Sequence, residues 1–150
     1  MEILPATVFD IPALLPLMEA FNGLEGIPWR PEPVRGALER LLREPSLGTV
    51  LAAWSATGEL VGYGVATFNY DLEFAGLDAF VTELFVAPAA RGRGVGKALL
   101  DAIVEHLRER GAGAVHLLVR PDNEEGRALY ESAGFRAVPR VMMTKELGPR

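Results

Sequence analysis

Cysteine is absent from all 150 residues of this chain. Its absence excludes a disulfide framework, a thiolate nucleophile and zinc sites built on cysteine. The first residues, MEILPATVFD, lack the basic region and long apolar run of a signal peptide, and no stretch approaches the roughly 18 apolar residues of a membrane span. We therefore expect a cytoplasmic protein that does not contact a membrane.

Basic residues are fewer than acidic ones, 15 against 20, so the formal net charge is -5. Sequence-independent nucleic-acid binding needs a basic face that neutralises phosphates, so we expect no nucleic-acid partner. With 49% hydrophobic and 23% charged residues, the composition is that of an ordinary globular protein. At this length, residues 1–150 are expected to form a single domain.

Apolar periodicity and turn residues predict an alternation of strands and helices along the chain. Strands are expected at residues 2–6, 49–55, 60–69, 79–86, 114–119 and 141–145, and helices at 10–21, 31–44, 94–110 and 124–133. Residues 22–30 are expected to form a loop, and residues 70–78 a long turn. This order predicts a mixed α/β fold of the α+β type, with helices packed on one sheet.

The segment Arg91 to Lys97, RGRGVGK, combines three glycines with three basic residues just before a helix. A glycine-rich turn at a helix N-terminus presents free N–H groups and the positive end of the helix dipole, which suits phosphate. Gly92, Gly94 and Gly96 allow close approach of the backbone. The alternative is a flexible, solvated turn that happens to be basic.

Two common phosphate-binding loops do not fit this spacing. The nucleoside-triphosphate loop requires glycine where Arg91 stands and a hydroxyl residue where Ala98 stands. The dinucleotide fingerprint requires a third glycine at the position of Lys97.

Two motifs together resemble the GNAT superfamily of acetyl-coenzyme A dependent N-acetyltransferases. The first is Arg-x-x-Gly-x-Gly, read at Arg91, Gly94 and Gly96, after a strand that ends in LFVAP. The second runs from Asn123 to Tyr130 and on to Gly134-Phe135, with Gly126 where the family usually has alanine. The resemblance covers essentially the whole chain. It implies a single-domain GNAT fold, with a mostly antiparallel sheet splayed at its central strand and about four flanking helices.

The resemblance also implies acetyl-coenzyme A as co-substrate, no metal, and a homodimer as one assembly. The cofactor-binding residues that it implies are Phe85, Val86, Arg91, Gly92, Arg93, Gly94, Val95, Gly96, Lys97, Asn123 and Tyr130. In the family, a bulge near this point splays the central strand, and the N–H of Leu84 would face the acetyl oxygen.

The family's reaction is direct attack of an amine on the thioester, which needs an acid and a base. Tyr130 is the candidate acid, because a tyrosine with a reference pKa of about 10 keeps its proton at neutral pH. Glu83 is the candidate base, because a carboxylate within an apolar strand is costly to bury without a role. The alternatives are a core tyrosine and a structural or substrate-positioning glutamate.

The acceptor is expected to be a small cationic amine or polyamine. The residues that suggest a pocket for it are Glu25, Trp29, Asp71 and Glu73, and the alternative is a solvated acidic face. An aminoglycoside, a protein amino group, and a module that binds coenzyme A without catalysis also remain open. His106 and His116 are expected to be packed or surface residues, neither ligands nor bases.

Overall fold

The structure is a computed structural model, and it describes residues 1–148. Two compact units can be separated, Met1–Leu118 and a shorter one that begins at Val119. Each unit is described by itself.

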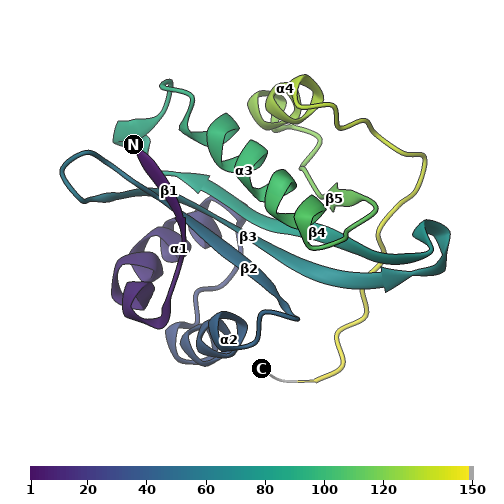
Figure 1. Ribbon diagram of the computed structural model, residues 1–150, viewed down its shortest axis with the longest axis horizontal. Helices are drawn as coiled ribbons and strands as arrows, with labels where there is room; N and C mark the ends of the chain where they lie inside the picture. The colour runs from purple at the N-terminus through teal and green to yellow at the C-terminus, as the bar shows by residue number, and fades with distance from the viewer. Residues whose placement is uncertain (149–150) are drawn as a thin grey trace. The chain divides into compact units, whose positions relative to one another are not determined.

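The first unit is built on a five-stranded sheet in the order β1-β2-β3-β4-β5 (Figure 1). Neighbouring strands are antiparallel except β4 and β5, which are parallel. The strands are β1 (Glu2–Pro5), β2 (Gly48–Trp54), β3 (Leu60–Asp71), β4 (Gly76–Val86) and β5 (Val115–Leu117). The helices of this unit are α1 (Ile11–Glu25), α2 (Pro31–Arg43) and α3 (Val95–Glu109), with short 3-10 turns η1 (Val8–Asp10), η2 (Leu72–Phe74) and η3 (Pro88–Ala90). The mostly antiparallel sheet is as predicted.

Helix α3 packs closely on one face of the sheet because two residues of β3 have no side chain. A Cβ on Gly64 would lie 2.2 Å from Ile103 Cδ1, and one on Gly62 would lie 3.1 Å from Leu99 Cδ1. Real Cβ atoms do not come within 2.2 Å of another atom, so a larger residue at Gly64 would displace the Ile103 side chain of α3.

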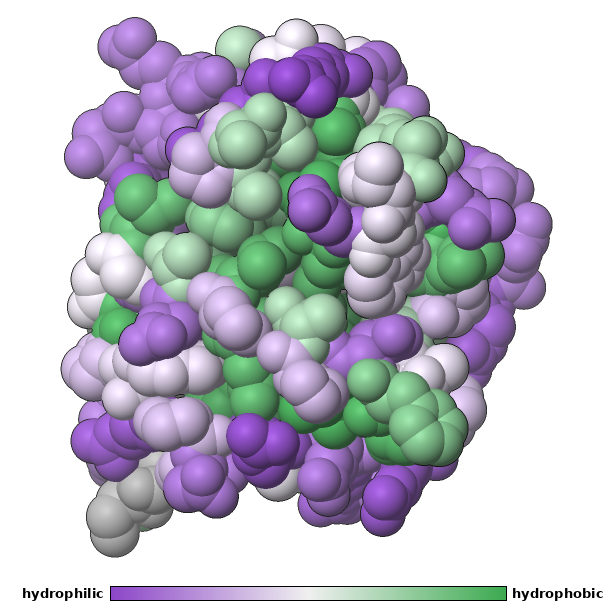
Figure 2. All heavy atoms as spheres, turned by 90° about the vertical axis from the view of Figure 1, so that its left-hand side faces the viewer, coloured by the Kyte–Doolittle hydropathy of each residue, from purple (hydrophilic) through white to green (hydrophobic). Residues whose placement is uncertain are grey.

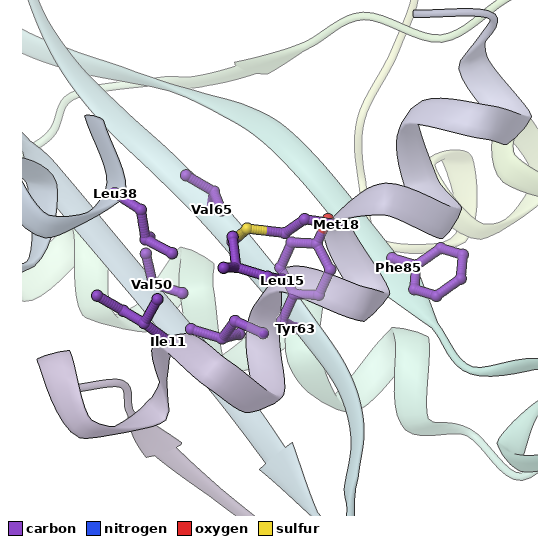
Figure 3. Close-up of a cluster of buried hydrophobic side chains, with 9 residues drawn as sticks. Ile11, Leu15, Met18, Leu38, Val50, Tyr63, Val65 and Phe85 are labelled. Atoms are coloured by element: carbon purple, nitrogen blue, oxygen red, sulfur yellow. The ribbon is translucent and has the colours of Figure 1, made fainter. Parts of the chain in front are cut away.

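Helices α1 and α2 cover the opposite face of the sheet (Figure 1). Their apolar residues and those of the strands form one buried cluster, of which Figure 3 shows nine members. Tyr63 belongs to this cluster and is 0% exposed. It is thus an aromatic ring with a hydroxyl group inside an otherwise apolar core.

The helix α1 is longer than predicted, because it continues through Pro16 to Glu25. A proline in a helix removes one backbone hydrogen bond, and the burial of Leu14, Leu15 and Met18 on either side of Pro16 compensates for it. The helix ends at Gly26, whose φ of 69° is in the left-handed region. Residues 22–25 are therefore helical and not part of the expected loop.

The second unit contains α4 (Glu124–Ser132), close to its predicted bounds. The strand expected at residues 141–145 does not form, and no strand occurs between Ala133 and Gly148. Val141 and Met143 are 87% and 91% exposed. Apolar residues in this segment suggested a strand, but a strand also needs a hydrogen-bonded neighbour, which composition does not supply. None of the described helices is long and apolar enough to cross a bilayer.

Candidate active site

The C-terminal half of β4 is a sheet edge that no strand of residues 1–148 covers. Strand β5 pairs with Ala79, Phe80 and Val81 only, whereas β4 continues to Val86. Residues 82–86 therefore have β3 on one side and no strand on the other. We call this stretch the open edge.

The hydrogen-bond register shows which peptide groups face the open edge. Ala87 N donates to Val61 O at 2.8 Å, and the same register continues through Val86, Phe85 and Leu84. Hydrogen-bonded and non-bonded pairs alternate along an antiparallel ladder, so Leu84 and Val86 direct their N–H and C=O groups away from β3. The peptide groups of Phe85 are directed toward β3.

A β-bulge separates the open edge from the part of β4 that pairs with β5. Val65 lies opposite Glu83 and Ala66 opposite Val81, so Thr82 is an extra residue in β4. A bulge bends its strand and interrupts the alternation of side chains between the two faces. It occurs in the strand where the family resemblance predicted one.

The segment from Arg91 to Lys97, which we call the glycine loop, follows the open edge and leads into α3. Gly92 and Gly94 both have a φ of +78°, and a Cβ on either would have no heavy atom within 4 Å. Gly94 is the N-cap of α3, and no side chain caps the first turn of this helix. Val95 is buried and fixes the helix start in the core. The loop therefore offers open space beside uncapped N–H groups.

Among the basic residues of the loop, Arg91 and Lys97 have protein partners. Arg91 Nε donates to Val86 O at 2.9 Å, and its guanidinium lies over the Phe85 ring, 5.4 Å from the centroid. Lys97 forms an exposed ion pair with Asp101, at 3.1 Å. Arg91 thus links the loop to the open edge of β4.

Arg93 lines a shallow hollow near the N-terminus. The hollow is also lined by Met1, Ser55, Ala56, Val61, Ala90 and Val95. Figure 2 views the side that carries the N-terminus and shows apolar surface between polar side chains there. The sequence did not predict this hollow beside the loop.

Glu83, the candidate base, is half-buried on the face of the sheet covered by α1 and α2. The Tyr63 hydroxyl donates to Glu83 Oε1 at 2.6 Å. Burial raises the pKa of Glu83, and the hydrogen bond from Tyr63 lowers it to a smaller extent. Burial, and then the charge of Glu83, raise the pKa of Tyr63, which therefore stays protonated as the donor.

Sequence reasoning did not single out Tyr63. The available signal was a tyrosine between Gly62 and Gly64 in an otherwise apolar strand. A buried tyrosine hydroxyl usually has a hydrogen-bond partner. The search for that partner could have led to Glu83.

A second polar cluster joins β3, β4 and β5. Asp78 is 1% exposed and accepts hydrogen bonds from Asn69 Nδ2 at 3.0 Å and from His116 Nε2 at 2.8 Å. The rings of Phe74 and Phe80 lie 5.2 and 4.9 Å from the His116 ring. His116 is thus a packed residue, as expected, but it is paired with a buried carboxylate. No group of three or more metal-ligating side chains occurs within residues 1–148.

Two candidates, Asn123 and Tyr130, lie in the second unit. Asn123 Oδ1 accepts from Gly126 N at 2.9 Å and so caps α4. A Cβ on Gly126 would lie 2.5 Å from Asn123 Nδ2, so the glycine makes room for this conformation of the asparagine. The Tyr130 ring lies 6.2 Å from the Phe135 ring.

The four acceptor candidates lie in two separate segments of the first unit. Asp71 and Glu73 belong to the β3–β4 turn, where Asp71 Oδ1 accepts from Glu73 N at 2.9 Å. Glu25 ends α1, and Trp29 precedes α2. Figure 1 places the β3–β4 turn at the far end of the hairpin, away from the connection between α1 and α2.

The geometry of the site indicates the kind of ligand that it can bind. A bulged, open strand that leads into a glycine loop at a helix N-terminus suits an extended ligand that adds to the strand and ends in a phosphate. Residues 14–135 match the family model described as "Acetyltransferase (GNAT) family". The chain therefore belongs to the GNAT family of acetyltransferases.

Individual relatives agree with this assignment. N-alpha-acetyltransferase RimI of Mycobacterium tuberculosis is 36% identical over 118 residues, which is 74% of this chain and 63% of that protein. Mycothiol acetyltransferase of Beutenbergia cavernae is 45% identical over 64 residues, 41% of this chain but only 22% of that protein. A solved structure described as a probable acetyltransferase has a TM-score of 0.88 at 25% identity and covers all of both chains.

Proposed function

We propose that this protein transfers the acetyl group of acetyl-coenzyme A to a primary amine by direct attack. One observation carries the proposal: Leu84 and Val86 direct their peptide groups to the open edge of β4, immediately before the glycine loop. The absence of cysteine agrees with a reaction that forms no thioester with the enzyme.

The described residues fit acetyl-coenzyme A. The extended arm of that molecule can pair with the peptide groups of Leu84 and with the N–H of Val86, whose carbonyl accepts from Arg91. Its pyrophosphate fits the loop of Arg91 to Lys97, because side chains at Gly92 and Gly94 would fill the space that the loop leaves open. Bound there, acetyl-coenzyme A supplies a thioester that an amine can attack.

Three groups of the chain would then act on the reaction, and a fourth would hold the donor. The Leu84 N–H would donate to the oxygen on which negative charge develops. Glu83 would accept the proton of the attacking amine, directly or through water. The Tyr130 hydroxyl would protonate the departing thiolate, and Asn123 would hold the far side of the donor.

We further propose that the acceptor is a small cationic amine or polyamine. An amine with a pKa of about 10.4 arrives mostly as a cation at neutral pH and must lose a proton before it attacks. Two separate segments would attract that cation: Glu25, with Trp29 to contact the apolar part of the amine, or Asp71 and Glu73 in the β3–β4 turn. The RimI relative is named an N-alpha-acetyltransferase, and we therefore take an α-amine as the second candidate acceptor.

A panel of acceptors tests both proposals. Purified protein is mixed with acetyl-coenzyme A and, separately, with polyamines, aminoglycosides, amino sugars and short peptides, and the release of free thiol is followed. Release with polyamines supports both proposals. Release with peptides alone supports the transferase but contradicts the acceptor. If all acceptors are inert while coenzyme A binds in calorimetry, the protein is a binding module.

A further inference from the structure

The hydrogen bond between Tyr63 and Glu83 joins the apolar core to the open edge of β4. The Tyr63 ring is fully buried among residues of α1 and the sheet (Figure 3), and its hydroxyl lies 2.6 Å from Glu83 Oε1. Glu83 is the first residue after the bulge at Thr82. This contact therefore holds a side chain at the point where the strand departs from regular geometry.

We propose that Tyr63 is a positioning residue for acetyl transfer, and that it holds Glu83 so that the other carboxylate oxygen takes the proton of the attacking amine. The inference rests on the proposed function, in which Glu83 is the base.

The geometry leaves one carboxylate oxygen for this task. Oε1 accepts from Tyr63, while Oε2 has no hydrogen-bond partner within residues 1–148. No buried side-chain oxygen or nitrogen in that part of the chain lacks a partner, so Oε2 is accessible. One oxygen is anchored in the core, and the other can meet an amine or a water molecule.

Burial of the Tyr63 hydroxyl among apolar residues costs free energy. The surrounding cluster is apolar, and phenylalanine would fill nearly the same volume without a polar group to desolvate. The hydrogen bond offsets that cost and favours the charged form of Glu83. Burial alone would hold Glu83 protonated up to a higher pH, and a protonated carboxyl cannot act as a base.

Other titratable groups do not explain the behaviour of Glu83. The pKa of Glu83 is shifted mainly by burial and, to a smaller extent, by the hydrogen bond from Tyr63. The remaining titratable groups of α1 and α2 are Glu19, Glu25, Glu32, Arg35, Glu39, Arg40 and Arg43, and those of the sheet are Glu2, Tyr70, Asp71, Asp78 and His116. Asp78 and His116 are bonded to each other.

The test is Tyr63→Phe in the full chain, with Tyr70→Phe as the matched control. Tyr70 lies on the same strand and is 71% exposed. Rates are measured against pH with the best amine of the acceptor panel. We expect Tyr63→Phe to move the acid limb of the kcat/KM profile to higher pH and to lower the rate on that limb about tenfold. The rate should recover at high pH, and coenzyme A affinity should stay unchanged.

A second experiment separates this inference from the proposed function. The titration of the Glu83 carboxyl carbon is followed by NMR in the wild type and in Tyr63→Phe, without substrate. A higher pKa in the variant shows that Tyr63 controls the Glu83 carboxyl, and if every amine is inert at the same time, the failure lies in the proposed function and not in this contact. An unchanged carboxyl titration, or an unchanged pH profile in an active enzyme, overturns the inference. In a Glu83→Gln background, Tyr63→Phe should have no further effect on turnover.

Discussion

Arg91 and Val86 are joined by a hydrogen bond of 2.9 Å from the guanidinium Nε to the carbonyl oxygen. The sequence assigned Arg91 to phosphate, and the structure also ties it to the open edge of β4. The same contact fixes the loop relative to the strand and keeps the Val86 carbonyl occupied.

Arg91→Ala should therefore weaken coenzyme A binding by about tenfold, because both a charge and the support of the loop are lost. The control is Arg110→Ala. Arg110 bonds to the Pro45 carbonyl at 3.1 Å and lies over the Phe68 ring at 5.1 Å, so it makes the same two kinds of contact away from the loop. Equal affinities of the two variants for coenzyme A in calorimetry would mean that Arg91 has only a structural role.

Gly94→Glu should abolish coenzyme A binding, because the side chain enters the space beside the phosphates and adds like charge. The position also has a positive φ, so the variant carries backbone strain. Gly111→Glu is the matched control, since Gly111 has a φ of +96° and equally open surroundings past the other end of α3. Similar thermal stability of the two, with binding lost only in Gly94→Glu, is the expected result. Full affinity in Gly94→Glu would contradict the loop assignment.

Glu83→Gln should lower kcat by about 10²–10⁴-fold and stabilise the fold at neutral pH. Burial raises the pKa of Glu83, so the native state binds this proton more tightly than the unfolded chain does. The stability that this group contributes is complete at low pH and is lost as the pH rises through the folded-state pKa. Urea unfolding of both proteins should show a gap in the free energy of unfolding that widens as the pH rises above the ordinary titration range of a glutamate. A gap that does not change with pH would show that Glu83 titrates normally.

Tyr130→Phe should reduce turnover and leave coenzyme A affinity nearly unchanged, because an acid that protonates the thiolate acts only late in the reaction. Steady-state kinetics and calorimetry on the same preparation separate the two quantities. Wild-type turnover in the variant would make Tyr130 a packing partner of Phe135.

Asp78→Ala should destabilise the protein by about 2–4 kcal/mol, because Asn69 and His116 would both lose a buried partner. Glu44→Ala removes an exposed ion pair with Arg40 and should change stability by less than about 0.5 kcal/mol. The midpoints of urea unfolding give both values. Equal midpoints would mean that the cluster around Asp78 contributes nothing to the fold.

Local patterns were enough to predict most of the helices, the β2–β3 hairpin and the glycine loop. The partner of Glu83 could not be found in this way, because it depends on the bulge at Thr82. In an unbroken strand, Glu83 would lie on the same face as Val81, toward α3. The extra residue turns it to the face of Tyr63. A one-residue irregularity thus decides which side of the sheet carries the candidate base.

The pairing of Asp78 with His116 could not be predicted from the sequence for a related reason. The two residues are 38 positions apart and meet only because β5 lies parallel to β4 at Phe80. The strand that was predicted at residues 141–145 and does not form also shows that local patterns do not reveal long-range pairing. Its apolar residues are suitable for a strand, but nothing in the sequence states whether an edge is available to pair with it.

The open edge of β4 also affects how the protein behaves without its ligand. Most proteins protect unpaired strands with charge, proline or a covering segment, because a bare edge can pair with a second chain. A strand that must receive a ligand cannot be blocked in this way, and residues 82–86, TELFV, contain only one charge. If coenzyme A adds to this edge as proposed, concentrated solutions of the protein should aggregate less with coenzyme A than without it.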